Sequence, residues 1–533
     1  MANIILLGGS NSAISNGLQK GLKDISEKNG GCFLNLSLGA TGYIQNFYEL
    51  KRDKNKEKFQ KADLIVTESN INDMGHNSCE HENLPLELFY KNLNLFYQEL
   101  CLLNKKVVVL ILPFTKQKNY KITNKIHKFL ALKFNFNIID MQEYYEKYDL
   151  EEFGSRFEGG GVHQQYAFLR ELGKNIAKNI NNFKTSSING EKIPCKFMYL
   201  SPNDMIFEGK IEENKMINSL YNENTFRLNE NNRLKFPKQA KNYEILAIHT
   251  WNNDLNTNEK FPPINARTWY ESTINYSSLL IENKNNFIVK ENNIFNMVTE
   301  VQKELKIDDE SYISYNKNNK KSTGQFFSCA SSWLKGARKL KHCDLVGLLL
   351  IKYPQNYELK IDLKKLEKED VKIPPKQDFS KLIPPICLYK EIIEEYCERL
   401  DAIKLASLKN EILSLKNELD FYKNTQKFIS HTKNYLSYQF GEALIFCSKS
   451  FFTLLCLPFV LYVISLKHKK ESKILVEKNS KENHNEKEIL KLKNSFTYKL
   501  GFAFIKAYKT WYKGGFVKFY FEIRKLKKEL KKV

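Results

Sequence analysis

Short apolar runs alternate with helical patterns along residues 1–185. The runs have the length and side-chain types of buried strands, and they are IILL at 4–7, CFLNLSL at 32–38, DLIVTE at 63–68, VVVLIL at 107–112 and FNIID at 136–140. Apolar residues at helical spacing fill the stretches between them, most clearly over 84–104. Strands separated by helices form a parallel sheet that is covered on both faces. The pattern therefore predicts a three-layer α/β domain over residues 1–185.

The pattern changes between residues 190 and 385 to short segments in which apolar and polar residues alternate. Clusters of Asn, Lys and Gly separate these segments, of which the clearest are YEILAIHTW at 243–251, SSLLIEN at 277–283, NNFIVKE at 285–291 and DLVGLLLIKY at 344–353. Alternation with a period of two is typical of strands with one buried face. We expect a second, β-rich domain with a sandwich-like arrangement over residues 190–385.

A helix with a short heptad pattern is predicted over residues 386–424. Its apolar positions recur in steps of three and four, and they are Leu405, Leu408, Ile412, Leu415, Leu419 and Tyr422. Such a seam is typical of a coiled coil. Because the pattern is short, a homodimer through residues 405–422 and an antiparallel helix packed on its own chain explain it equally well.

The C-terminal part contains an internal repeat. Seven residues recur at a constant offset: Asn434, Ser437, Tyr438, Gly441, Ala443, Ile445 and Lys449 correspond to Asn494, Thr497, Tyr498, Gly501, Ala503, Ile505 and Lys509. The first copy belongs to an apolar segment over 434–466, which a polar linker over 467–493 connects to a tail over 494–533. The tail interleaves aromatic residues with Lys and Arg, as helices at a membrane surface do.

The apolar run at 451–466 is shorter than a typical membrane span. Its 16 residues would measure about 24 Å as a helix, less than the hydrocarbon core of about 30 Å. Pro458 interrupts it, and lysines flank it on both sides. We expect a peripheral or monotopic attachment to the inner face of the cytoplasmic membrane. A buried hairpin within a soluble helical subdomain is the alternative.

The net charge indicates which class of partner the protein binds. The net charge of +22 favours an anionic partner, either a nucleic acid or an anionic membrane surface. No nucleic-acid motif occurs, and the basic tail has a helical, apolar pattern, so the membrane is favoured.

The start of the chain lacks the basic region and cleavage site of a secretory signal, which predicts a cytoplasmic protein. The 10 cysteines lack metal-ligand spacing, so no disulfide and no metal site is predicted, and no cofactor motif is present.

The first predicted strand leads through Gly8-Gly9 to Ser10 at the start of a helix. The turn lacks the Gly-x-Gly-x-x-Gly and Gly-Lys-Ser/Thr patterns of phosphate-binding loops. The backbone N–H groups at a helix start favour negative charge that develops close by, which suits a nucleophile. A turn with no chemical role has the same sequence, so Ser10 alone does not decide between the two.

Three further segments lie at the same predicted sheet edge: Leu38-Gly39-Ala40, Ser69 to Asp73 and Gly161 to Gln164. Together with the Ser10 turn they resemble the four blocks of the SGNH (GDSL-like) hydrolase and transferase family. The resemblance covers about the first third of the chain and implies a flavodoxin-like parallel sheet.

The resemblance implies a role for each block. Ser10 is the nucleophile, the backbone N–H of Gly39 and the side-chain amide of Asn72 form the oxyanion hole, and His163 is the general base. The Asp that the family places three residues before the histidine is Gly160 here. Glu158 is then the candidate to orient His163, and without it the site is a Ser-His dyad.

Within this family, LLGGSNS, LGATGYIQNFYEL and LIVTESNIND resemble proteins from capsule-biosynthesis loci of Campylobacter-like bacteria. Those proteins are viewed as transferases that decorate capsular polysaccharide, including the transfer of O-methyl phosphoramidate to sugar hydroxyls. The resemblance implies a polysaccharide acceptor and an activated donor as partners. A carbohydrate or lipid esterase with the same serine site, and an inactive glycan-binding scaffold, are the alternatives.

Aromatic residues of the β-rich region allow two interpretations. Trp251, Trp269, Tyr270 and Trp333 could stack on sugar rings, but we expect them in the sandwich core. His249 and His342 lack metal-ligand spacing and are interpreted as ordinary histidines.

Overall fold

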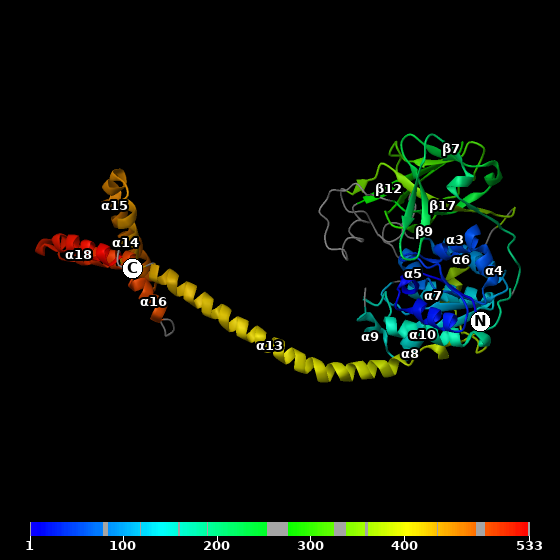
Figure 1. Ribbon diagram of the computed structural model, residues 1–533, viewed down its shortest axis with the longest axis horizontal. Coiled ribbons are helices and arrows are strands. Elements are labelled where there is room, and N and C mark those ends of the chain that lie inside the picture. The colour runs from blue at the N-terminus through cyan, green and yellow to red at the C-terminus, as the bar shows by residue number, and fades with distance from the viewer. Residues whose placement is uncertain are drawn as a thin grey trace. The chain divides into compact units, whose positions relative to one another are not determined.

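The computed structural model describes residues 2–77, 84–117, 119–157, 160–188, 190–252, 275–323, 337–355, 357, 361–433, 435–475 and 486–530. The chain divides into two compact units, Met1–Ile392 and Ile393–Val533 (Figure 1). Each unit is described by itself below.

A parallel sheet lies at the centre of the N-terminal part. Its strands are β1 (Ile4–Leu7), β2 (Phe33–Asn35), β3 (Leu64–Thr67), β4 (Lys106–Ile111) and β5 (Asn137–Asp140), in the order β2-β1-β3-β4-β5. Every pairing between them is parallel. The predicted α/β class is therefore confirmed for this part of the chain.

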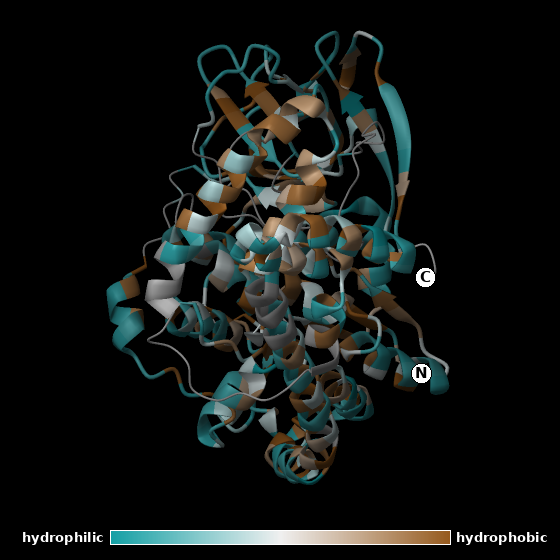
Figure 2. Cartoon of the chain, turned by 90° about the vertical axis from the view of Figure 1, so that its left-hand side faces the viewer, coloured by the Kyte–Doolittle hydropathy of each residue, from teal (hydrophilic) through white to brown (hydrophobic). Residues whose placement is uncertain are grey.

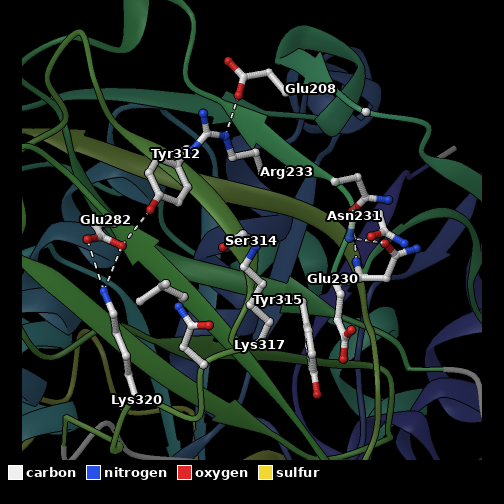
Figure 3. Close-up of a pocket in the computed structure, with 15 residues that line it drawn as sticks. Glu208, Glu230, Asn231, Arg233, Glu282, Tyr312, Ser314, Tyr315, Lys317 and Lys320 are labelled. Atoms are coloured by element: carbon white, nitrogen blue, oxygen red, sulfur yellow. Dashed lines mark hydrogen bonds and ion pairs between the residues drawn. The ribbon is translucent and has the colours of Figure 1, made fainter.

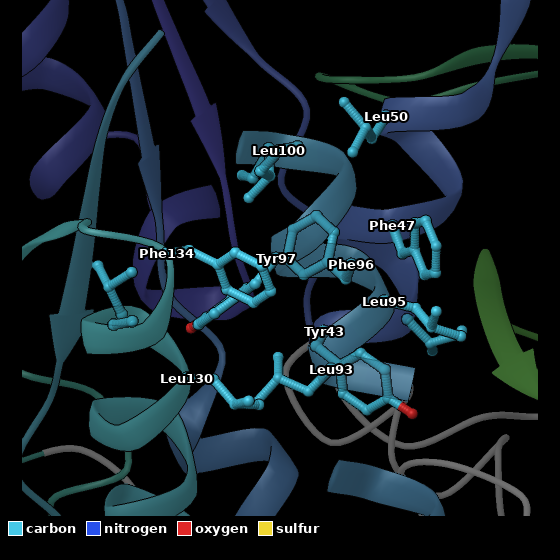
Figure 4. Close-up of a cluster of buried hydrophobic side chains, with 14 of the residues drawn as sticks. Tyr43, Phe47, Leu50, Leu93, Leu95, Phe96, Tyr97, Leu100, Leu130 and Phe134 are labelled. Atoms are coloured by element: carbon cyan, nitrogen blue, oxygen red, sulfur yellow. The ribbon is translucent and has the colours of Figure 1, made fainter. Parts of the chain in front are cut away.

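Helices cover both faces of the sheet, because successive strand residues point to opposite sides. Ile5 and Leu7 face a core with α3 (Tyr43–Lys51), α6 (Leu86–Cys101) and α7 (Tyr120–Lys133). Ile4 and Leu6 face a second core with α2 (Leu18–Lys28), α5 (Asn70–Asn77), α8 (Met141–Lys147) and α10 (Tyr166–Lys178). Figure 4 shows the aromatic side chains that fill the first of these cores.

Shorter helices complete this part of the fold. They are α1 (Ser10–Ala13), α4 (Asp53–Lys61) and α9 (Glu151–Ser155).

The region after residue 195 contains two mainly antiparallel sheets within its described residues. One contains β13 (Phe287–Asn292), β12 (Asn275–Glu282), β15 (Tyr312–Tyr315), β10 (Arg233–Lys235) and β7 (Ile206–Glu208), in that order, with β16 (Arg338–Lys339) beside β12. The other contains β14 (Met297–Glu300), β11 (Glu244–Thr250), β17 (Cys343–Lys352), β9 (Asn222–Leu228) and β8 (Glu212–Ile217), with β6 (Lys196–Leu200) beside β17. Figure 2 shows hydrophobic residues along these strands in brown.

A shared core joins the two sheets face to face. Leu279, Ile281 and Ile313 of the first sheet pack with Leu345 and Leu348 of the second. The β-rich character predicted for this region is confirmed.

The second sheet also packs against the α/β part. Leu246, Ala247 and Leu349 point away from the sandwich core and join the core that contains Phe47 of α3. Arg52 forms a buried ion pair with Glu223, with 2.6 Å between Nη2 and Oε2. The α/β and β-rich parts consequently belong to one compact unit although the sequence pattern separates them at 185–190.

The segment after the last strand returns to the α/β part. β17 ends at Lys352, and α12 (Leu363–Lys368) follows it. Ile138 of β5 donates its N–H to Gln377 O at 2.8 Å, and Phe379, Leu382 and Ile386 enter the second α/β core. The region predicted as β-rich to residue 385 thus contains no strand among its described residues after Lys352.

The C-terminal unit is helical. Its elements are α13 (Ile386–Lys433), which begins in the first unit, α14 (Leu436–Cys447), α15 (Phe451–Leu475), α16 (Glu486–Lys493), α17 (Phe496–Lys509) and α18 (Gly515–Leu530). All six heptad residues of α13 are exposed. The structure therefore shows the predicted helix, while the dimer through 405–422 remains a prediction.

The two copies of the internal repeat pack against each other as α14 and α17. A Cβ added at Gly441 would lie 1.8 Å from Thr497 O, and one added at Gly501 would lie 1.7 Å from Ser437 O. Ser437 and Thr497 occupy the same position in the two copies of the repeat, as do Gly441 and Gly501. Each glycine therefore packs against the same position of the other copy, and the contact is reciprocal. Only glycine permits this backbone approach at both positions.

The apolar run forms the first part of α15. The 19 residues of Phe451–Lys469 are long and apolar enough to cross a membrane, by length and composition only, and none of that window is buried. Pro458 lies inside the helix without ending it. The helix is longer than the predicted run of 451–466 because the following lysines continue it.

Candidate active site

Ser10 begins α1, directly after the Gly8-Gly9 turn that ends β1. The Gly9 N–H and the Ser12 hydroxyl both donate to Oε1 of Glu68 at 2.8 Å. A Cβ at Gly8 would lie 2.6 Å from that same oxygen. The turn is therefore built around a buried carboxyl group, and burial raises the pKa of Glu68 to about 7.

His163 faces Ser10 from the loop before α10. Its Nε2 lies 2.9 Å from Ser10 Oγ. This is hydrogen-bond distance, although the two residues are 153 positions apart. With Nε2 as the acceptor, the ring can take the hydroxyl proton of Ser10, which is the arrangement of a serine nucleophile and its base.

Asn11 holds the His163 loop from both sides. Its Nδ2 donates to Val162 O at 2.9 Å, and its Oδ1 accepts from Gln164 N at 2.9 Å. Gln164 in turn donates from Nε2 to Pro113 O at 3.0 Å and to Gly161 O at 2.8 Å. Both amide side chains are buried, so solvent does not compete for these bonds.

Asn72 lies beside the nucleophile turn. Its Nδ2 donates to Thr41 O at 2.8 Å, and a Cβ at Gly9 would lie 2.1 Å from that nitrogen. An amide nitrogen carries two protons, so Asn72 keeps a second donor beyond the bond to Thr41. A side chain at Gly9 would collide with Asn72, which accounts for glycine at this position.

The Gly39 loop runs along the same turn. Leu38 N donates to Gly8 O at 2.9 Å, and no heavy atom lies within 4 Å of a Cβ placed at Gly39. Ala40 has a φ of 59°, in the left-handed region. The space beside Gly39 is therefore open for a substrate atom.

A buried chain of polar groups supports this loop and α5. Asp73 Oδ1 accepts from Tyr43 N at 3.0 Å, and its Oδ2 lies 3.0 Å from His127 Nε2. His127 Nδ1 lies 2.8 Å from the Tyr97 hydroxyl. Burial lowers the pKa of His76, whose ring also interacts with the Ala40 backbone. These contacts fix the entry to α5 and thereby the position of Asn72.

The structure thus brings together the four segments that carry the predicted residues. Ser10 follows β1, Gly39 follows β2, Asn72 lies in the α5 segment after β3, and His163 precedes α10. Glu158 lies outside the described residues. Among the described residues, no group of three or more His, Cys, Asp or Glu side chains could hold a metal ion.

Sequence reasoning missed Asn11, Glu68 and Gln164. Each had a signal. Asn11 and Gln164 directly follow Ser10 and His163, and Glu68 is a charged residue at the end of an apolar strand run. A carboxyl group at the end of a buried strand is either exposed or accepts hydrogen bonds from nearby N–H groups. The glycine turn after the first strand is a source of such N–H groups.

Trp251 is only 9% exposed, so it is buried as expected, but it packs with Leu38, Tyr221 and Val346 in a small cluster separate from the sandwich core. Trp269, Tyr270 and Trp333 lie outside the described residues. His249 is buried, with Nδ1 3.1 Å from the Tyr48 hydroxyl. Burial and the nearby Arg52 lower its pKa to about 3, so it is a neutral core histidine at ordinary pH.

Comparisons with known proteins match parts of the chain. The model of a family described as a domain of unknown function, DUF8374, matches residues 352–532. No curated protein matches the chain. Similar solved structures include an acetyl xylan esterase, which is 16% identical with a TM-score of 0.28, and the likeness covers 33% of this chain and 97% of the esterase.

Two further solved structures are similar to this chain to about the same extent. A lipolytic protein of the G-D-S-L family from Desulfitobacterium hafniense is 14% identical, with a TM-score of 0.27 and coverage of 34% of this chain and 99% of that one. An acetyl-xylooligosaccharide esterase from Geobacillus is 16% identical, with a TM-score of 0.28 and coverage of 34% and 92%. TM-scores this low carry no argument about activity, so the site is interpreted from its own geometry.

Proposed function

We propose that this protein is a serine-dependent transferase that moves an acyl-type or O-methyl phosphoramidate group from an activated donor to a hydroxyl of a capsular or related surface polysaccharide. The observation that carries the proposal is the 2.9 Å contact between His163 Nε2 and Ser10 Oγ. A hydroxyl becomes a nucleophile when an adjacent base removes its proton, and this contact supplies that base.

The first half-reaction loads the serine. The Ser10 Oγ–H proton passes to His163 Nε2 as Oγ bonds to the electrophilic carbon or phosphorus of the donor. The bond to the donor's leaving group then breaks, and the leaving group takes the proton from His163. In this proposal, the second N–H of the Asn72 amide and the backbone N–H of Gly39 stabilise the negative charge that develops on the transferred group.

The second half-reaction releases the group. An acceptor hydroxyl gives its proton to His163, its oxygen bonds to the transferred group, and the bond to Ser10 Oγ breaks as the proton returns to Oγ. When water takes the place of the acceptor, the same steps give hydrolysis. Because Ser10 and His163 are both partly exposed, an esterase is the second candidate function.

The choice between transfer and hydrolysis is tested with two substrates. The purified protein is incubated with an aryl ester, and separately with the donor and the surface polysaccharide of the source cells. We expect modification of the polysaccharide and slow release of the aryl alcohol. Fast turnover of the aryl ester without any acceptor would replace the transferase proposal with the esterase.

A further pair of variants tests the serine site itself. Ser10→Ala should abolish modification, while Ser15→Ala, five positions away and exposed, should leave it unchanged. Undiminished modification of the polysaccharide in cells that carry Ser10→Ala would support the inactive scaffold instead.

We infer further that the C-terminal unit attaches the protein to the inner face of the cytoplasmic membrane. Its apolar side chains are exposed on α15 and α18, among them Phe452, Phe459, Phe516 and Phe521. Lysines surround them and attract anionic lipid. Because lysines flank the apolar run 451–466 at both ends, we propose that both ends of this run stay on the cytoplasmic side.

The membrane proposal is tested with vesicles. Full-length protein should sediment with vesicles that contain anionic phosphatidylglycerol and less with purely zwitterionic phosphatidylcholine vesicles. A C-terminus that is labelled from the periplasmic side of intact cells would overturn the monotopic arrangement.

A further inference from the structure

The outer face of one β-sheet carries a cavity of about 440 Å³, within the range of about 300–1,000 Å³ that is typical of ligand sites. Its floor is formed by neighbouring strands β7, β10, β15 and β12 (Figure 3). Glu208, Arg233, Ser314 and Leu280 form one row across these strands, as the strand pairing shows. Lys235, Tyr312 and Glu282 form the next row.

Polar side chains in this cavity are held in place by one another. Tyr312 donates its hydroxyl to Glu282 Oε2 at 2.7 Å, and Lys320 Nζ lies 3.0 Å from the same oxygen. Arg233 pairs with Glu208, and its guanidinium carbon lies 4.5 Å from the centre of the Tyr312 ring. Side chains that are already ordered lose little conformational freedom when a ligand binds.

The lining is balanced in charge. Three carboxylates, Glu208, Glu230 and Glu282, face three cations, Arg233, Lys317 and Lys320. Four asparagines add groups that both donate and accept: Asn229, Asn231, Asn232 and Asn318. A balanced set attracts neither an anion nor a cation by net charge, but it suits a ligand whose hydroxyl groups both donate and accept.

One apolar surface completes the chemistry. The partly exposed Tyr312 ring lies among these polar groups, with the buried Leu280 in the floor of the cavity. A sugar ring has an apolar C–H face and a rim of hydroxyls, so it matches an aromatic or aliphatic surface ringed by donors and acceptors.

We propose that this cavity binds an uncharged stretch of the polysaccharide acceptor, at a distance from the hydroxyl that reacts. The identity of the ligand rests on the proposed function. The cavity itself does not, because its shape and lining are independent of the Ser10 site.

The position of the sheet separates this cavity from the Ser10 site. The inner faces of the two sheets share one core, and the other face of the second sheet packs on α3. Figure 1 shows β7 and β12 on the far side of β9 and β17 from α5 and α7. Since packed sheets lie about 10 Å apart, a ligand in the cavity cannot reach Ser10 unless it is a polymer that passes around the sandwich.

The test uses full-length protein in which Ser10→Ala prevents turnover. Binding of the surface polysaccharide, purified from source cells that lack this protein, is measured by calorimetry. Ser314→Tyr fills the cavity floor without removing an ion pair. Lys215→Tyr, at an exposed position of β8 in the other sheet, is the matched control.

We expect Ser314→Tyr to weaken binding about tenfold or more, because the added ring occupies the ligand's space, and Lys215→Tyr to leave it unchanged. Circular dichroism checks that both variants fold. If Ser314→Tyr is misfolded, Lys317→Ala combined with Lys320→Ala tests the rim instead. Unchanged binding in folded cavity variants, or no binding by the parent protein, would overturn the proposal.

Charge and chain length give two independent readouts. Binding should change little between 50 and 300 mM salt, and a strong loss with salt would show that the site takes an anionic segment instead. In protein with Ser10 intact, Ser314→Tyr should raise KM for the polymer without changing kcat, and should not affect a disaccharide acceptor. If no transfer occurs at all but the calorimetric difference persists, the proposed function fails while this cavity proposal stands.

Discussion

The two units of this protein differ in whether their large apolar side chains are buried or exposed. In the N-terminal unit, Phe47 and Phe96 are at most 1% exposed. In the C-terminal unit, Phe451, Phe452 and Phe459 are 71% exposed or more. Both units are well formed in secondary structure, so the difference does not come from a lack of folding. The first unit therefore provides its own apolar environment, whereas the second leaves many large apolar side chains exposed, which is typical of surfaces that bind a partner or a membrane.

Charged residues follow the same division. The N-terminal unit buries charges in partnered networks, as at Arg52, where Glu49 and Glu223 both form ion pairs with the guanidinium. The C-terminal unit keeps Lys513, Lys518 and Lys525 on its surface beside exposed aromatic residues. Removing one partner of a buried pair leaves an uncompensated charge, so such pairs belong to a closed core, whereas exposed cations next to aromatic side chains favour an anionic lipid surface.

The largest expected effect is the loss of catalysis when the serine site in the N-terminal unit is removed, while membrane binding by the C-terminal unit remains. Ser10→Ala and His163→Ala should each lower kcat by about 10⁴ or more, and the double variant should be little worse, because a nucleophile and its base act as one unit. Vesicle binding should be unchanged in all three. Additive losses in kcat would contradict a shared role.

Removing the C-terminal helices should break the attachment alone. A chain ending at residue 425 retains the whole N-terminal unit, so it should move completely from the membrane fraction to the soluble fraction and keep its activity on a soluble donor and acceptor. Membrane fractionation and a kinetic assay check this. A truncated chain that still sediments with membranes would show that the N-terminal unit also binds lipid.

The reciprocal glycine contact should fix the shape of the C-terminal unit. Gly501→Leu should destabilise the packing of α14 on α17 by about 3 kcal/mol or more, since a Cβ already meets Ser437 O at 1.7 Å. Limited proteolysis of detergent-solubilised protein should then cleave α14 faster. Phe502→Leu, on the exposed side of the same helix, should not change the rate.

Glu68 should make the N-terminal unit less stable as pH rises. Burial raises its pKa from 4.5 to about 7 in the folded state, so between these values the folded state binds more protons than the unfolded state. The free energy of unfolding therefore falls as pH increases from about 4.5 to 7, by about 3 kcal/mol at most.

Glu68→Gln keeps an acceptor for Gly9 and Ser12 but cannot ionise. Urea unfolding of the chain ending at residue 425 should show that this fall is missing in the variant. Glu57→Gln, at an exposed residue paired with Lys61, should keep it. Parallel curves for Glu68→Gln and the parent chain would contradict the raised pKa.

The sequence predicted the first sheet well because most of its strand runs are continuous and buried and are separated by helical patterns; β2, which is only partly buried, is shorter than its predicted run. It also pointed to the loops of Ser10, Gly39, Asn72 and His163, since parallel strands place their carboxyl ends at one edge. It could not predict that β11 and β17 pack on α3, because an apolar residue in an alternating strand does not say which core it joins. The hydrophobicity of Phe452 and Phe459 likewise does not show whether these side chains lie in a core or at the surface.

Asn11 offers the finest test of how the N-terminal unit positions its site, because it holds the His163 loop without itself holding a reacting atom. Asn11→Ala removes the bonds to Val162 O and Gln164 N, each 2.9 Å long, and lets His163 move relative to Ser10. We expect kcat to fall about tenfold to a hundredfold with little change in KM, since small displacements of a base mainly affect the chemical step. Asn16→Ala, at an exposed residue of the same segment, should leave both constants unchanged. Because a merely structural role would lower the amount of folded protein without changing kcat per folded molecule, kcat is normalised to folded protein measured by circular dichroism. A normal kcat for folded Asn11→Ala would show that Gln164, through its own bonds to Pro113 and Gly161, suffices to hold His163 in place.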